Sequence, residues 1–155
     1  MTTTTPRPRK PLAALWLGLA LTVGALIVLY ADRALGDVLR GHIAAGYPDL
    51  SAEALDTAAL MYLVYLSVLG GIGVLCWLLI IWSVSAGKRW ARWVATAIFA
   101  VAACLALTNL TITDTNGEVG LAPLHGWVGL APTLAGLLAV VLLWLTPRGR
   151  AGAAR

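Results

Sequence analysis

The sequence predicts an all-α membrane protein, a bundle of four transmembrane helices. Three observations predict this fold class. Of the 155 residues, 60% are hydrophobic and only 12% are charged, whereas about 25% of the residues in a soluble domain are charged. Four apolar runs, about 12–31, 60–84, 91–110 and 124–145, each reach the roughly 20 residues that an α-helix needs to cross a bilayer. Charged side chains are missing from the interiors of all four runs.

The basic residues predict the orientation of these helices. Nine of the eleven lysines and arginines fall on one side of a four-span layout, and all seven acidic residues fall on the other. Lys88, Arg89 and Arg92 cluster at the inner loop 85–90. Because lysine and arginine accumulate in short cytoplasmic loops, we expect these three residues to determine the topology. Both termini are then cytoplasmic, in a multi-pass protein of a plasma membrane.

The first predicted helix follows a short polar tail. Residues 1–11 are rich in threonine, proline and basic residues, and we expect them to be disordered in the cytoplasm. The run 12–31 is longer than a signal-peptide core and no A-x-A site closes it, so we interpret it as an uncleaved anchor. Gly18 and Gly24 each follow an alanine at i, i+4, a spacing that lets a second helix approach closely.

The outer loop 32–59 continues the helical pattern beyond the membrane. Its apolar residues fall on one face as far as a turn signal at 46–49, and Ser51 is suited to cap the helix that enters the second span. We therefore expect helices 1 and 2 to extend beyond the membrane as an outer helical hairpin. A pair of short helices lying flat on the membrane is the alternative, which the scarcity of lysine disfavours.

The apolar stripe of this hairpin is a candidate interface. It must be covered by something, because burying a leucine or isoleucine contributes about 1.5–3 kcal/mol. A second copy or a partner protein is one cover, and the outer loop 111–123 of the same chain is the other. The stripe residues are Leu35, Val38, Leu39, Ile43 and Leu55.

Small residues in the other spans indicate close helix packing. Ser67 and Gly71 form an i, i+4 pair in the second span, where Trp77 approaches the inner face. In the fourth span Gly129 belongs to a small-residue face, and Pro132 predicts a kink because it removes one backbone hydrogen bond. The four-helix membrane domain ends near residue 146, and the basic tail 147–155 is expected to be disordered.

Patterns typical of catalysis or metal binding are not found in the sequence. The interiors of the spans lack ionisable residues, which counts against pumps and proton-coupled transporters. The serines have no G-x-S-x-G context and the cysteines have no C-x-x-C spacing. His42 and His125 fall on the outer side without a recognisable ligand spacing. We predict no enzyme activity, no metal and no cofactor, and the scattered basic flanks argue against nucleic acid.

Residues 46–93, with the motifs G-Y-P-D-L-S, M-Y-L-V-Y-L-S-V and G-K-R-W-A-R-W, carry a resemblance to a known group. The likeness continues through D-T-N-G-E-V-G-L-A-P-L-H-G-W-V-G and covers most of the chain. The chain resembles an uncharacterised family of small four-span integral membrane proteins of actinobacteria type. The resemblance implies a bacterial plasma membrane and supplies no activity and no functional residues.

Two functions follow from these patterns. The favoured one is a structural or interaction component, either a homo-oligomer or an accessory subunit, because the small-residue faces and the outer hairpin suit protein contacts. The alternative is a binder or carrier of a lipid or a small neutral or apolar molecule within the helix bundle, which Pro132 and the Gly70–Gly73 cluster favour. A cavity open to the membrane would distinguish the carrier from the interaction protein.

Overall fold

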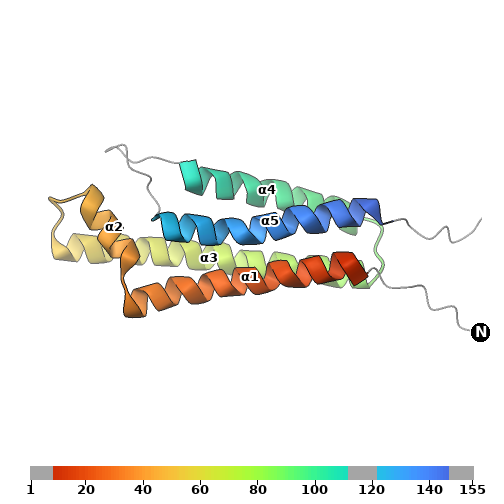
Figure 1. Cartoon of the computed structure of the whole chain (residues 1–155), viewed down its shortest axis with the longest axis horizontal. Coiled ribbons are helices and arrows are strands. Elements are labelled where there is room, and N and C mark those ends of the chain that lie inside the picture. The colour runs from red at the N-terminus through yellow and green to blue at the C-terminus, as the bar shows by residue number, and fades with distance from the viewer. Residues whose placement is uncertain (1–8, 112–121, 147–155) are drawn as a thin grey trace, which may run out of the picture.

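The computed structural model describes residues 9–111 and 122–146 and confirms an all-helical bundle (Figure 1). The described part contains helices α1 (Arg9–Leu35), α2 (Val38–Gly46), α3 (Ala52–Ser85), α4 (Ala91–Thr111) and α5 (Pro123–Leu145). All except α2 are long and apolar enough to cross a membrane. The predicted spans therefore correspond to α1, α3, α4 and α5.

The four long helices form a ring with one loose seam. They run side by side along the long axis of the molecule (Figure 1). α1 packs along α3 and α5, and α5 also packs along α4, whereas α3 and α4 contact each other much less. We call the boundary between these last two helices the α3/α4 seam. A bundle that is tight on three sides and loose on the fourth can hold an internal space that opens sideways.

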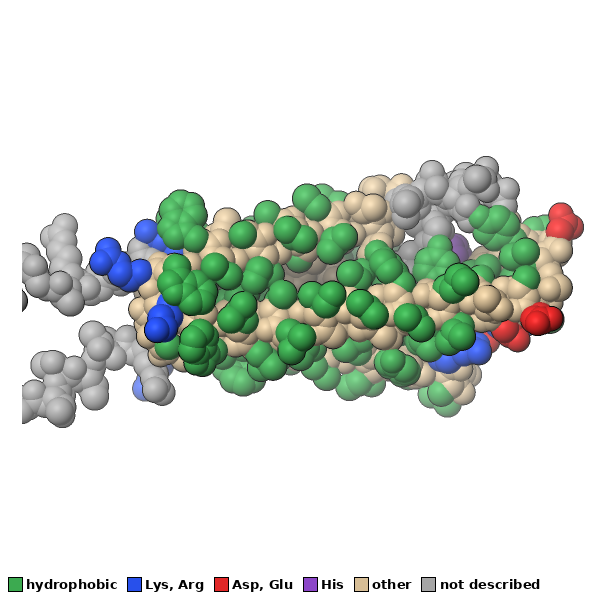
Figure 2. Space-filling view, turned by 180° about the vertical axis from the view of Figure 1, so that it is seen from behind, with side chains coloured by type: hydrophobic (Ala, Val, Ile, Leu, Met, Phe, Trp, Pro, Cys, Tyr) green, Lys and Arg blue, Asp and Glu red, His purple; other side chains and the backbone are tan. Residues whose placement is uncertain are grey.

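Charged side chains lie at the two ends of the bundle (Figure 2), and the acidic ones that the structure describes lie at one end together with Arg33 and Arg40. We call the end with Lys10, Lys88 and Arg89 the basic end, and the end with Asp49 and Glu53 the acidic end. α1 begins and α5 ends at the basic end, beside the turn that joins α3 to α4 (Figure 1). This separation agrees with the distribution of charge along the sequence.

The basic end is closed by a tight turn and a packed core. After α3, the N–H groups of Gly87 and Lys88 donate to the carbonyl oxygens of Val84 and Ser83, the pattern of a Schellman motif. Gly87 has a φ of 65°, which glycine adopts without steric cost. Next to this turn, apolar side chains of all four long helices form one cluster, namely Ala14, Leu15, Ile80, Ile81, Val84, Ala91, Ala95 and Ala139.

The first helix begins three residues earlier than the sequence predicts. α1 starts at Arg9, and Pro11 is tolerated there because the first turn of a helix needs no N–H donor. The rest of the predicted tail 1–11, the tail 147–155 and residues 112–121 of the outer loop 111–123 lie outside the described residues.

The predicted outer hairpin is present, but its first arm is a separate helix. α1 ends at Leu35, and Asp37 adopts a left-handed backbone with a φ of 50°, a conformation that aspartate tolerates better than most residues. The carboxylate of Asp32 then accepts hydrogen bonds from the backbone N–H groups of Val38 (2.9 Å) and Leu39 (3.1 Å). Asp32 thus caps α2, because the side chain of Asp37 forms an ion pair with Arg33 and makes no cap hydrogen bond to α2.

The second arm is continuous with its membrane span, as the sequence predicts. Ser51 caps α3 by accepting the N–H of Ala54 at 3.2 Å. α2 packs on the first turns of α3, where Arg40 Nε lies 2.6 Å from Asp56 Oδ1. The hydrogen bond to Asp56 and the charge of its carboxylate raise the pKa of Arg40. The contact between α2 and α3 favours a hairpin over two helices lying flat.

The structure divides the apolar stripe of the hairpin. Leu39, Ile43 and Leu55 are buried within the chain, together with Ala59 and with Ala122 from the end of the loop 111–123. Leu35 is 89% exposed and Val38 is 46% exposed. Three of the five candidate interface residues are therefore covered by the chain itself, because the short α2 turns this face onto α3.

Candidate functional site

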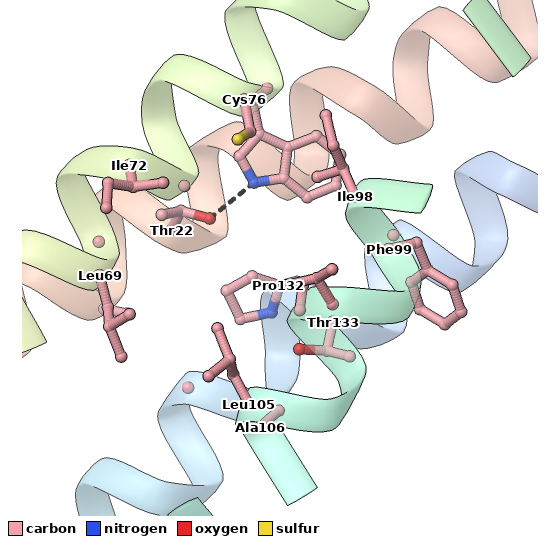
Figure 3. Close-up of a pocket in the computed structure, with 18 of the residues that line it drawn as sticks. Thr22, Leu69, Ile72, Cys76, Ile98, Phe99, Leu105, Ala106, Pro132 and Thr133 are labelled. Atoms are coloured by element: carbon pink, nitrogen blue, oxygen red, sulfur yellow. Dashed lines mark hydrogen bonds between the residues drawn. The ribbon is translucent and has the colours of Figure 1, made fainter. Parts of the chain in front are cut away.

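A pocket of about 500 Å³ lies inside the bundle, between the four long helices. Each of these helices contributes to its wall, with Thr22 from α1, Cys76 from α3, Leu105 from α4 and Pro132 from α5 among the lining residues (Figure 3). Its volume is typical of small-molecule sites, which occupy roughly 300–1,000 Å³. Nearly all of the lining is apolar, so the pocket suits a hydrophobic molecule.

Trp77 lines the pocket in the half nearer the basic end. Its indole N–H donates to Thr22 Oγ1 at 2.9 Å (Figure 3), and the same hydroxyl donates to the carbonyl oxygen of Gly18 at 2.9 Å. The ring lies against Gly18 of α1, where a Cβ atom would clash with it, and reaches within 3.6 Å of the Cβ position of Gly136 on α5. Gly18 thus makes room for this large side chain, whereas the distance at Gly136 is an ordinary van der Waals contact.

The side wall on α5 combines a glycine with a proline. Gly129 lines the pocket, and no atom lies within 4 Å of the position that its Cβ would occupy. The ring of Pro132 lies beside Thr133 on the same wall (Figure 3). Because proline has no N–H, it cannot bond to the carbonyl of Val128, which also lines the pocket. The small side chains on this wall leave the interior unfilled.

We infer that the pocket opens at the α3/α4 seam, where the two helices make few contacts. Ile72 of α3 and Val101 of α4 both line the pocket, and both side chains are exposed. At the acidic end the seam is bridged by the hydroxyl of Tyr65, which donates to Asn109 Oδ1 at 3.0 Å. At the basic end the short turn between the helices holds them together. The opening therefore faces lipid, midway along the spans.

A buried polar pair lies at the acidic end of the pocket. His125, in the first turn of α5, lines the pocket, and its Nε2 is 3.5 Å from Asp32 Oδ2. The two side chains are only 3% and 6% exposed. Neither ring nitrogen of His125 has a hydrogen-bond partner among the described residues. A buried polar group without a partner is costly, so this imidazole is the feature of the pocket that most needs a ligand.

The structure places the predicted packing residues at several different sites. Gly18 contacts Trp77, and Gly129 and Pro132 line the pocket. The hydroxyl of Ser67 lies 2.9 Å from that of Tyr30 and so joins α3 to α1. Gly24 and Gly71, by contrast, have no atom within 4 Å of their Cβ positions.

The three topology residues lie together at the basic end. Lys88 Nζ lies 5.9 Å from the ring centroid of Trp82. The guanidinium of Arg92 lies 4.4 Å from the ring centroid of Trp144, and Arg89 belongs to the same turn. Cations over tryptophan faces are favourable contacts, and aromatic rings at this level are typical of the membrane–water boundary.

Two features of the site were not predicted from the sequence. The sequence places Trp77 near the inner face, whereas its ring lines a pocket in the middle of the bundle. The only signal was its position, deeper within an apolar run than Trp82. The sequence predicts His125 to be an interfacial hydrogen-bonding residue on the outer side, and its proximity to Asp32 depends on packing between α1 and α5. His42 lies on α2 and does not line the pocket.

Comparisons with known proteins add no relative. No family model, no curated protein and no solved structure matches the chain. Among the described residues, no group of three histidine, cysteine, aspartate or glutamate side chains is placed to hold a metal ion. The pocket is therefore the candidate site on its geometry alone.

Proposed function

We propose that the protein binds a lipid-like or other apolar molecule in the pocket between its four membrane helices. The observation that carries this proposal is an apolar pocket of about 500 Å³ that is bordered by the loosely packed helices α3 and α4. An opening at the level of the spans lets a ligand enter from the bilayer without crossing water. This is the binder or carrier function that the sequence left as an alternative.

The charge distribution supports an orientation for this function. Lysine and arginine favour the cytoplasmic side, so the basic end, with Lys88, Arg89 and Arg92, is proposed to face the cytoplasm. The acidic end, with His125, then lies in the outer half of the membrane. The bacterial plasma membrane is part of the same proposal, supported by the resemblance of residues 46–93 to four-span bacterial proteins.

A structural or interaction role stays a prediction, and fewer residues of the apolar stripe now support it. Leu39, Ile43 and Leu55 are covered within the chain. Leu35 and Val38, which remain exposed at the start of α2, are the part of the stripe that a second copy or a partner could cover. Pocket binding and oligomer formation are compatible, so a test of one does not decide the other.

Filling the pocket from within tests the proposed function. Gly129→Leu places a large side chain in the pocket without an initial clash, because the Cβ position of Gly129 is open. Gly71→Leu is the matched control, since its Cβ position is equally open but Gly71 does not line the pocket. Apolar molecules retained by the two variants and by the wild-type protein after purification in one detergent are quantified by mass spectrometry.

We expect the wild-type protein and Gly71→Leu to retain a comparable amount of ligand per chain, and Gly129→Leu to retain several-fold less. A ligand at 100 times its Kd stabilises the folded state by about 2.7 kcal/mol, so adding the retained molecules back should raise the Tm of the wild-type protein and the control only. Equal retention in all three proteins would refute the pocket as a binding site.

A further inference from the structure

We infer that His125 and Asp32 form the polar end of the pocket and select an apolar ligand that carries an uncharged hydroxyl group. This inference rests on the proposed function and adds the chemistry of the ligand head. Its starting point is a buried imidazole that lines the pocket with both ring nitrogens unpartnered among the described residues.

The carboxylate of Asp32 is already well compensated. Its two oxygens accept the backbone N–H groups of Val38 and Leu39 at the first turn of α2, where the helix dipole favours a negative charge. Asp32 therefore does not need a cationic partner. Because burying an additional charge is far more costly than burying a neutral ring, His125 is expected to be a neutral imidazole.

The position of Asp32 selects one tautomer of that imidazole. Nε2 of His125 faces Asp32 Oδ2 at 3.5 Å, and a carboxylate can only accept a hydrogen bond. The proton of the neutral ring is therefore favoured on Nε2. Nδ1 is left with a lone pair and without a partner, and because this atom is buried, the ring must turn slightly toward the pocket for a ligand to reach it. The site thus presents an acceptor, which must be matched by a donor on the ligand.

A hydroxyl group fits this acceptor better than the other common lipid heads. It donates to Nδ1, and its oxygen can accept from an amide such as that of Asn109, which lines the same end of the pocket. A carboxylate or a phosphate has no proton to donate at neutral pH, and the negative charge of Asp32 repels it. A plain hydrocarbon leaves the imidazole unpartnered.

The rest of the ligand then lies along the pocket toward Trp77. His125 and Gly136 are both on α5, and Gly136 lies beside the indole of Trp77. Eleven residues separate them along the helix, which corresponds to about 16 Å. The pocket therefore accommodates an extended apolar body with its hydroxyl at the acidic end.

The test compares probes that share one chain and differ in the head: 1-dodecanol, its methyl ether, dodecanoic acid and dodecane. Binding to the full-length protein is measured by native mass spectrometry in an amine-oxide detergent, which has no hydroxyl group. The variant is His125→Phe, which keeps a planar ring and removes both nitrogens. Each Kd is expressed as a mole fraction of probe in the detergent micelles. Partitioning of the probe between water and micelles then does not affect the comparison between proteins.

We expect His125→Phe to weaken dodecanol binding by about 3- to 10-fold, as for the loss of one net hydrogen bond, and to leave dodecane binding unchanged. The wild-type protein alone should prefer dodecanol to its methyl ether by a similar factor, which tests the inference even if the variant misfolds. Dodecanoic acid binding most tightly, or dodecanol and its ether binding equally to wild type, would overturn it while the pocket stands. If no probe binds wild type, the proposed function itself fails.

Discussion

Trp77 lies in the interior of the bundle and lines the pocket in the half nearer the basic end. Its indole occupies space that exists only because residue 18 on the facing helix has no side chain. The hydrogen bond to Thr22 then holds the ring in this position. One glycine and one hydroxyl on α1 therefore determine the position of the Trp77 ring in the pocket wall.

Gly18→Ala should destabilise the protein by about 1–3 kcal/mol, the usual cost of overpacking a well-filled interior. The added methyl group would overlap the Trp77 ring and force it away from Thr22. Gly24→Ala is the matched control, because no atom lies within 4 Å of its Cβ position, and alanine is the better helix former by about 0.5–1 kcal/mol.

Unfolding midpoints of the two purified variants measure this difference. The expected order is Gly18→Ala below the wild-type protein and Gly24→Ala equal to it or above it. A Gly18→Ala midpoint equal to that of the control would mean that the Trp77 ring moves without cost.

The same two glycines show what the sequence can and cannot predict at the scale of a residue. Both follow an alanine at i, i+4, so their local patterns are alike. Only Gly18 faces a large side chain, because the position of Trp77 is set by how α3 packs on α1. A spacing motif indicates that close approach is possible, but the partner that uses it is a tertiary feature.

At the scale of elements, α2 depends on a side chain outside itself. Asp32 belongs to α1, yet its carboxylate accepts the first two N–H groups of α2 and lies beside His125 of α5. A single carboxylate thus connects three helices at the acidic end. The nine-residue α2 is far shorter than helices that are stable alone in water, so this cap and the contacts with α3 must hold it.

Asp32→Ala should loosen α2 while leaving the membrane spans in place. Loss of a helix cap costs about 0.5–2 kcal/mol, so the amide hydrogens at the start of α2 should exchange roughly 2- to 30-fold faster. Hydrogen exchange followed by mass spectrometry measures this, with Asp49→Ala as the control at an exposed acidic position of the same hairpin. Unchanged exchange in α2 would show that packing on α3 suffices without the cap.

The sequence predicts the first arm of the hairpin as a continuation of the first span, whereas the structure has a break between α1 and α2. The apolar positions keep a helical spacing across Gly36 and Asp37, so periodicity alone favours one long helix. The left-handed backbone of Asp37 interrupts it, and a glycine followed by an aspartate is the local signal that could have indicated a turn. Ser51, in contrast, was recognised because its cap is made within four residues of sequence.

At the scale of the whole molecule, the separation of charge predicts a single orientation in the membrane. Cysteine introduced at Lys88 should be inaccessible to an impermeant thiol reagent in intact cells, whereas cysteine at Asp49 should react. The background must have Cys76 and Cys104 replaced, since both are free thiols. Labelling at position 88 but not at position 49 would invert the proposed orientation and place His125 near the cytoplasm.

The number of spans and the distribution of charge could be predicted because they depend only on composition along the chain. The pocket could not, since it arises from unequal packing around a ring of four helices. Every helix contributes small residues, but the space is left open only where α3 and α4 separate. Residues such as Gly129 and Cys76 look like ordinary packing positions until the ring is closed.

The shortness of α4 has a consequence for the surrounding bilayer. From Arg92, at the basic end, to Asn109, at the acidic end, α4 has an apolar length of about 26 Å, less than the roughly 30 Å of an average hydrocarbon layer. A hydrophobic helix that is shorter than the hydrocarbon layer can thin the membrane locally. Because α4 borders the opening of the pocket, the thinned annulus of lipid lies at the point where a ligand would leave the bilayer. We predict that membrane thickness then acts on the entrance itself.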